Sequence, residues 1–208
     1  MRINDPKYLL LQYPLNNTSK EILNRNPGNW SGTEGYAETN YNHLQGANLT
    51  GANYITLGSA VTLSPPFSVS IWYKPGTLAG YETAWSFIGS NQAGIDLNMG
   101  GGGTSMTCRI DTDGNPNQAI FNQNTSIKNN NLNQIVVTCN PGSLLTLYVN
   151  GEFKTNTFFN GSLITNFTTI GIGRKNYGNH GNGILKDFRV YNTNLTWNEI
   201  NQLYHQNE

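Results

Sequence analysis

Charged side chains are scarce in this chain. Asp, Glu, Lys and Arg make up 12% of its 208 residues, and 12 acidic side chains balance 12 basic ones, so the formal net charge is zero. An average soluble domain carries roughly 25% charged residues. Without an excess of Lys and Arg, the sequence offers no basic surface for nucleic acid. A protein with a net charge near zero also has little electrostatic repulsion against association. This favours a partner, a homo-oligomer or a larger assembly.

Long hydrophobic runs are missing as well. No stretch approaches the roughly 20 apolar residues of a membrane-spanning helix. Residues 1–7 lack the apolar core of a signal peptide, so we expect a protein that is not secreted by the standard route. Only two cysteines are present, Cys108 and Cys139, each in phase with apolar neighbours. We interpret them as buried thiols, and the alternative is a disulfide between adjacent strands.

Asparagine takes the place of the charged residues, at about one residue in six. Such a bias has two explanations that stay open at this stage. One is a surface rich in amides that is used for contact, and the other is an AT-rich genome. Composition therefore argues against nucleic acid as a partner and against a membrane-spanning helix, but it does not identify a partner.

Short strand patterns separated by turn residues follow one another along the chain. Residues 67–73 alternate between apolar and polar side chains, as a half-buried strand does. Asn150-Gly151 is the preferred pair for a two-residue type I′ hairpin, in which Tyr148 would face Phe153. Asp113-Gly114 marks a second hairpin. Short strands with Gly, Asn and Pro turns indicate an antiparallel sandwich, and 208 residues suit one such domain.

The C-terminus predicts a strand, a turn and a helix. Residues 183–194 favour a strand that ends in turn-forming asparagines. Thr196 is a good N-cap, and Glu199, three residues later, completes a capping box. We therefore expect a short helix that runs to about Tyr204 and packs back onto the domain.

This ending resembles that of laminin G-like, concanavalin A-like jelly-roll domains, which typically read G-x-I-D-E-V-R-I-Y-N-x-x-L-S-x-x-E-I-x-x-L-Y. Residues 67–75 and 145–151 resemble two further motifs of that family, F-T-I-S-F-W-V-K-P and L-x-L-Y-V-N-G. The matching C-terminal residues are Gly183, Ile184, Asp187, Arg189, Val190, Tyr191, Asn192, Leu195, Thr196, Glu199, Ile200, Leu203 and Tyr204. The resemblance covers about residues 8–204 and is weakest in 16–46 and 90–131. It implies a single all-β domain, an antiparallel two-sheet jelly-roll sandwich with a short C-terminal helix.

The same sandwich also hosts glycoside hydrolases, so enzyme activity is the first alternative that the sequence must support or exclude. Those enzymes need two carboxylates that flank the scissile bond, and in this fold they lie on one strand as Glu-x-Asp-x-Glu or a close variant. No such triplet occurs, and Asp96 stands alone in its predicted strand. The Gly-x-Ser-x-Gly nucleophile elbow is also absent. We therefore predict a protein that is not an enzyme and has no catalytic residue.

A lectin-like sandwich would bind sugar with aromatic faces and amides on its loop rim. The alternative for each aromatic residue is packing onto the sandwich, which is how we interpret Trp72 and Trp85 in their strands. Trp197, at the helix start, is expected in the core or at the rim. The loop candidates for ligand binding are Trp30, Tyr36, Tyr41, Tyr81, Arg174, Asn176, Tyr177, Asn179 and His180.

One segment could hold a cation. Asp111, Asp113 and Asn115 offer two carboxylates and an amide oxygen, part of the ligand set that Ca²⁺ prefers. We favour a plain hairpin turn as the interpretation of this segment. Asp96 and Asp187 are further candidates if folding brings them near other oxygens. No other cofactor is expected.

Two functions agree with these observations. The first is a non-enzymatic recognition or adhesion module that binds glycan or a surface protein through its loop rim. The second is a structural subunit of a larger assembly, such as a minor capsid or capsid-associated viral protein. The missing signal peptide, the net charge of zero and the Asn-rich composition favour the second. A location on a virion surface is compatible with both.

Overall fold

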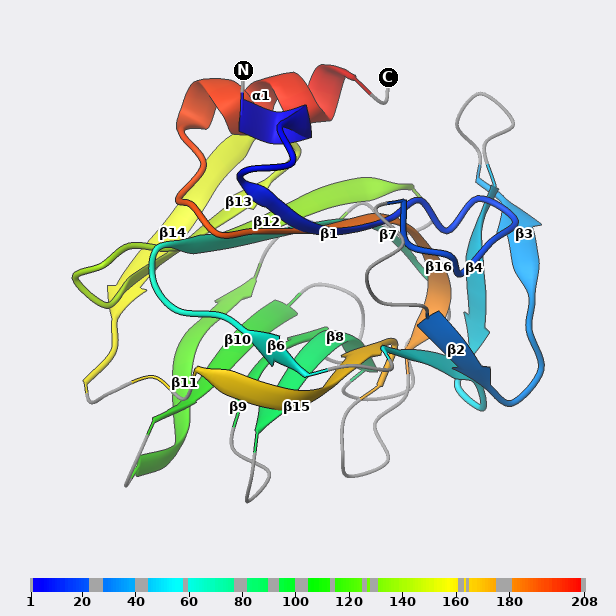
Figure 1. Ribbon diagram of the computed structural model, residues 1–208, viewed down its shortest axis with the longest axis horizontal. Helices are drawn as coiled ribbons and strands as arrows, with labels where there is room; N and C mark the ends of the chain where they lie inside the picture. The colour runs from blue at the N-terminus through cyan, green and yellow to red at the C-terminus, as the bar shows by residue number, and fades with distance from the viewer. Residues whose placement is uncertain are drawn as a thin grey trace.

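The computed structural model describes residues 2–22, 28–39, 45–57, 60–76, 82–89, 94–99, 105–112, 115–124, 127, 131–160, 163, 165–174 and 181–206. These residues form two antiparallel sheets packed face to face, with a short helix near each end of the chain (Figure 1). The helices are η1 (Arg2–Asn4) and α1 (Trp197–His205). The expected all-β sandwich with a C-terminal helix is confirmed.

The first sheet, called sheet A, lies under the two helices. Its strands are β1 (Leu9–Tyr13), β3 (Tyr36–Glu38), β4 (Gln45–Thr50), β7 (Phe67–Pro75), β12 (Asn133–Cys139), β13 (Leu144–Val149), β14 (Glu152–Phe158) and β16 (Asn182–Tyr191). Their order is β14-β13-β12-β7-β16-β4-β3, and β1 pairs with β16. The last strand of the chain therefore lies near the middle of this sheet.

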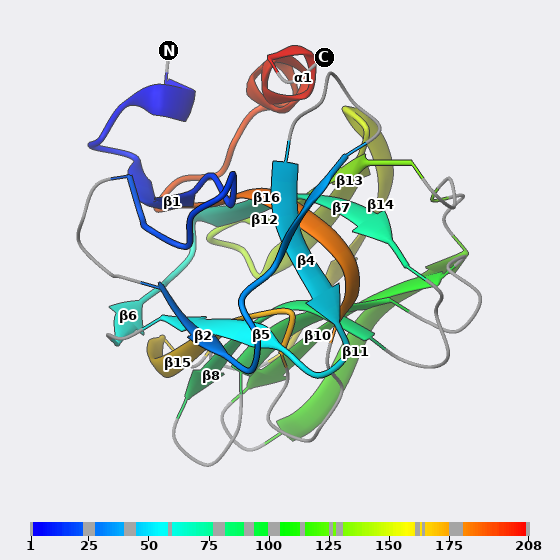
Figure 2. The same cartoon turned by 90° about the vertical axis from the view of Figure 1, so that its right-hand side faces the viewer.

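The second sheet, called sheet B, forms the opposite layer (Figure 2). Its strands are β2 (Gly28–Ser31), β5 (Tyr54–Leu57), β6 (Val61–Thr62), β8 (Glu82–Gly89), β9 (Gly94–Met99), β10 (Ser105–Thr112), β11 (Asn115–Asn124) and β15 (Asn166–Ile172). Their order is β11-β10-β9-β8-β15-β5-β2, and β6 pairs with β15. β10 pairs with β11 antiparallel, as a hairpin requires, and the expected turn residues Asp113 and Gly114 lie outside the described residues.

The hydrophobic core fills the space between the sheets. Alternation along β7 turns Phe67, Val69, Ile71 and Tyr73 inward, as the sequence pattern predicts. Opposite them, Trp85 is fully buried, which confirms its role in packing. The predicted packing role of Trp72 is also correct, since this side chain is 2% exposed and stacks on Tyr204 of α1, with 5.7 Å between ring centroids.

Both cysteines are buried free thiols, as the favoured interpretation held. Cys108 lies in β10 of sheet B and Cys139 in β12 of sheet A, so the alternative of a bridge between adjacent strands was wrong. Burial raises the pKa of both thiols, and that of Cys139 rises to about 12. At neutral pH both groups are therefore protonated core side chains.

The C-terminal helix has the predicted capping box. The Thr196 hydroxyl accepts from the Glu199 backbone N–H at 3.4 Å, and the Thr196 backbone N–H donates to Glu199 Oε2 at 2.9 Å. Ile200 and Leu203 pack with Leu195 in a small cluster on the outer side of sheet A. Trp197 lies at the rim, where its side chain is 55% exposed and its indole N–H donates to the Gly151 carbonyl at 3.1 Å.

The prediction of a hairpin at Asn150-Gly151 is also confirmed. Both residues have positive φ, 53° and 76°, as a type I′ turn requires. Tyr148 faces Phe153, and their rings meet edge to face with centroids 6.1 Å apart. Residues 16–46, where the resemblance to the family is weakest, contain the short strands β2 and β3 and the start of β4.

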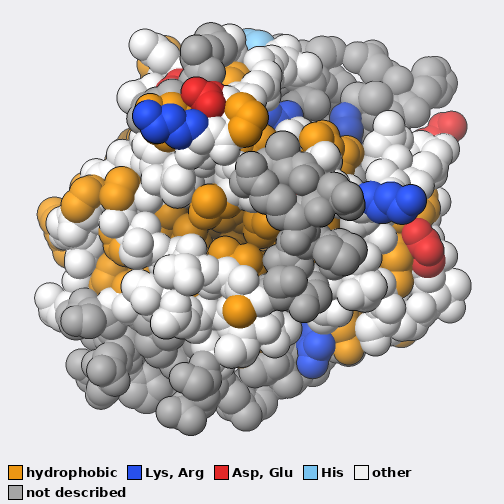
Figure 3. Space-filling view, viewed as in Figure 1, with side chains coloured by type: hydrophobic (Ala, Val, Ile, Leu, Met, Phe, Trp, Pro, Cys, Tyr) orange, Lys and Arg blue, Asp and Glu red, His pale blue; other side chains and the backbone are white. Residues whose placement is uncertain are grey.

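The surface reflects the composition. Figure 3 shows few Lys, Arg, Asp and Glu side chains on the face it presents, and they lie scattered among neutral atoms. Neither helix in the described part of the chain is long and apolar enough to cross a membrane.

Candidate binding surface

The side of sheet B that faces away from the core carries a row of polar residues in register across six strands. We call it the polar row, and from β2 to β10 it consists of Asn29, Thr56, Gly171, Ser86, Asp96 and Arg109. Each strand alternates, so that residues such as Phe87 and Ile95 point into the core beside Ser86 and Asp96. At the usual strand spacing the row is about 24 Å long.

A charged cluster forms the β9–β10 end of this row. The Arg109 guanidinium lies 3.1 Å from the Asp96 carboxylate and 3.2 Å from that of Asp111. Asp96 and Asp111 side chains are only 4% and 5% exposed, whereas Arg109 is 19% exposed. The Asn98 amide donates to Asp96, and the Thr83 hydroxyl donates to Asn98 at 2.7 Å. These bonds hold the polar groups in fixed positions.

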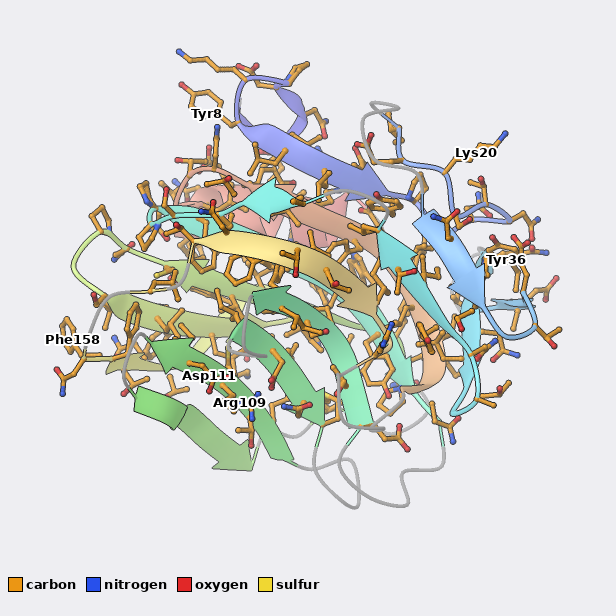
Figure 4. All side chains as sticks on the ribbon, turned by 60° about the horizontal axis from the view of Figure 1, so that its bottom comes forward. Tyr8, Lys20, Tyr36, Arg109, Asp111 and Phe158 are labelled. Carbon is orange, nitrogen blue, oxygen red and sulfur yellow. The ribbon has the colours of Figure 1, made fainter. Side chains whose placement is uncertain are left out.

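The cluster corrects one expectation from the sequence. Asp96 is the one acidic residue of β9, as the sequence indicates, and the pairing of β9 with β10 places it opposite Arg109. Asp111 was assigned to the hairpin turn, but it lies in β10, and its carboxylate also accepts from the Gly94 backbone N–H at 3.3 Å. Figure 4 shows Arg109 and Asp111 close together on sheet B. Alternating polar residues in these two strands were the signal that could have indicated the surface.

Arg174 lies beside the middle of the row, where it contacts residues of β8, β15 and β5. Its guanidinium stands over the Tyr54 ring, 4.6 Å from the ring centroid. The Ser86 hydroxyl donates to the Arg174 backbone carbonyl at 2.5 Å. A Cβ on Gly171 would lie 3.0 Å from that same carbonyl oxygen, closer than ordinary contact. Glycine at this position therefore allows the Arg174 segment to rest on the polar row.

Trp30 and Tyr36 lie in strands β2 and β3, and not in a loop as expected. Their rings meet edge to face at 5.8 Å, and the indole N–H of Trp30 donates to the Tyr36 hydroxyl at 3.3 Å. Tyr36 in turn donates to Glu34 at 2.7 Å. Burial, followed by this bond to Glu34, raises the pKa of Tyr36 to about 12. The pair links the edges of the two sheets and packs against the core.

The other expected site residues have no described placement. Tyr41, Tyr81, Asn176, Tyr177, Asn179, His180 and Asp113 lie outside the described residues. Asn115 belongs to β11, but its side chain is not among those described. Within the described part of the chain, no three His, Cys, Asp or Glu side chains group as a metal site would require. The Ca²⁺ expectation for Asp111, Asp113 and Asn115 therefore stays a prediction.

Two antiparallel sheets closed by a capped helix define a jelly-roll sandwich, and comparison with known families narrows that class. A family model described as "Concanavalin A-like lectin/glucanases superfamily" matches residues 49–201. The chain belongs to this superfamily. No curated protein sequence gives a significant match.

Several solved structures share the fold. One is domain 4 of AbnA, a GH43 extracellular arabinanase from Geobacillus stearothermophilus, whose structure was solved in complex with arabinotriose. It aligns with this chain at a TM-score of 0.78 and 21% sequence identity. The alignment covers 95% of this chain and 99% of that domain. The binding domain of Paraclostridial Mosquitocidal Protein 1 has a TM-score of 0.77 and 15% identity, and that of botulinum neurotoxin serotype D has 0.72 and 16%. The chain covers 52% of each toxin domain, and both are aligned over 96% of this chain.

Proposed function

We propose that the protein is a non-enzymatic recognition module that binds carbohydrate through the outer face of sheet B. The observation that carries this proposal is the polar row with its fixed cluster of Asp96, Arg109 and Asp111. The AbnA domain, whose fold is shared along nearly its whole length, was solved with arabinotriose. The toxin domains, which are binding domains, also support a binding role.

The chemistry of the row suits a sugar. A sugar hydroxyl both donates and accepts, so it pairs with a carboxylate oxygen and a guanidinium N–H at the same time. Bonds to ionised groups are the stronger kind. Because Arg109 already fixes Asp96 and Asp111, little side-chain freedom is left to lose when a ligand binds. Arg109, the most exposed of the three, is the group that a ligand would reach first.

A glycan array tests the proposal. We expect the chain to bind a defined set of glycans, and Arg109→Lys to weaken that binding about tenfold or more, because lysine lacks the planar fork of donors. Thr56→Val removes one exposed hydroxyl from the row at nearly constant volume and should weaken binding a few-fold. Lys154→Gln, on β14 of sheet A, is the control and should bind as the parent does.

Thermal unfolding of each variant separates loss of binding from loss of fold. Unchanged binding by folded Arg109→Lys and Thr56→Val would remove the polar row from the proposal. If the parent binds no glycan at all, recognition of carbohydrate is rejected, and the structural subunit becomes the better explanation. Running the array in Ca²⁺ and in EDTA tests the expected cation site in the same experiment.

A further inference from the structure

We infer that Arg174 and Tyr54 form a subsite for a carboxylate group of the ligand, so that the preferred ligand is an acidic saccharide. This inference rests on the proposed carbohydrate-binding function. Tyr54 and Thr56 lie two residues apart in β5, so the Tyr54 ring is on the same side of sheet B as the polar row. Arg174 covers that ring and is itself only partly buried.

The charge of Arg174 is used differently from that of the two ion-paired arginines, Arg109 and Arg189. Arg109 and Arg189 each bind an aspartate of this chain. Within the described residues, Arg174 forms no ion pair, and its guanidinium contacts the neutral Tyr54 ring. The segment 175–181 that follows it contains no Asp or Glu. The positive charge at this point is therefore available to a group from another molecule.

Stacking prepares the guanidinium for a planar acid. The aromatic ring contacts the flat face of the cation, whereas the N–H donors point outward in the plane of the group. A carboxylate matches two parallel donors of that plane, which gives a bidentate charge-assisted pair.

Backbone anchoring fixes the distance between this subsite and the charged cluster. Ser86, a member of the polar row, holds the Arg174 carbonyl at 2.5 Å and lies opposite Asp96 on the neighbouring strand. The guanidinium itself lies over Tyr54 in β5, and from β5 to Arg109 in β10 is four strand spacings, or about 19 Å. One ligand could thus place its carboxylate at Arg174 and its hydroxyls along Asp96 and Arg109.

A matched pair of probes tests the inference. An oligogalacturonide carries carboxylates, and its methyl ester is the same saccharide without their charge. We expect the chain to bind the acid about tenfold or more tightly than the ester, as bonds to charged groups suggest. Arg174→Gln should abolish this preference, because the affinity for the acid should fall much further than the affinity for the ester. Tyr54→Leu, which removes the stacking surface, should reduce the preference.

Lys154→Gln is the control, because it removes the same charge from β14, which belongs to sheet A and not to the sheet that carries Tyr54. It should keep the preference for the acid. Equal affinity of the parent for acid and ester, or a preference that survives Arg174→Gln, overturns the subsite but leaves the proposed function intact. Binding of neither probe nor any arrayed glycan overturns both. Equal affinity for a sulfated oligosaccharide of the same length overturns the assignment to carboxylate.

Discussion

At the scale of single residues, a chain with few charges places several of them in buried pairs. Asp187 and Arg189 are both 8% exposed, and Arg189 Nη2 lies 2.7 Å from Asp187 Oδ2. The Gln12 amide donates to Asp187 at 3.1 Å, and Arg189 donates to the Asn4 side chain at 3.1 Å. Asp187 was kept as a potential cation ligand, but here it joins β16 to the N-terminal segment.

Removal of one partner from this pair should be costly. We expect Arg189→Gln to lower the free energy of unfolding by about 3–5 kcal/mol, because it leaves the Asp187 carboxylate buried without its counter-ion. Asp187→Asn combined with Arg189→Gln should recover part of that loss. Urea denaturation measures the free energy of unfolding of the parent, of Arg189→Gln and of the double variant. Lys154→Gln, at the exposed pair with Glu152, is the control and should cost less than about 1 kcal/mol.

A loss of less than about 1 kcal/mol for Arg189→Gln would contradict this account of the buried pair.

Contacts between single residues also explain why the candidate surface was not predicted from the sequence. Asp96 and Arg109 are separated by twelve residues, and only the register of β9 with β10 brings their charges into contact. Trp30 and Tyr36 were recognised as notable, but their packing at the sheet edges depends on the pairing of β2 with β5 and of β3 with β4.

At the scale of elements, the sequence predicted the turns and caps that depend on neighbouring residues, but it did not predict the pairing of distant strands. The Asn150-Gly151 turn and the Thr196 cap depend on neighbouring residues, so the sequence contains all the information they require. Strands β2 and β4 are short and polar, and each is stabilised by a distant partner, β5 and β16 respectively. No hydrophobic periodicity within residues 16–46 indicates that β5 and β16 are the partner strands.

The N-cap of α1 provides a prediction at this scale. Thr196→Ala should destabilise the protein by about 1 kcal/mol, because the Glu199 backbone N–H loses its acceptor. The thermal unfolding midpoint measures the effect. Asn198→Ala, at an exposed position of the first helical turn, is the matched control and should be neutral or slightly stabilising. A Thr196→Ala variant as stable as the parent would mean that the cap does not hold α1 on sheet A.

At the scale of the whole molecule, the superfamily and its sandwich were predictable because motifs occur along most of the chain. The same closed core buries several tyrosines, among them Tyr13, Tyr73 and Tyr191. Burial raises the pKa of each, and that of Tyr191, whose hydroxyl donates to the Ile3 carbonyl at 3.2 Å, rises to about 12. In the unfolded chain a tyrosine titrates near pH 10.

The stability of the domain should therefore fall at alkaline pH. A tyrosine with a raised pKa contributes stability that is fully present below about pH 10 and is lost as pH rises toward the folded value, by roughly 1.4 kcal/mol per unit of difference. The Cys139 thiol, whose pKa burial raises from 9.0 to about 12, adds to the loss from about pH 9. Urea unfolding between pH 7 and 11 measures the slope, and Tyr191→Phe should make it shallower. A free energy of unfolding that stays constant to pH 11 would contradict burial of these hydroxyls, since an exposed tyrosine titrates alike in both states and leaves stability unchanged.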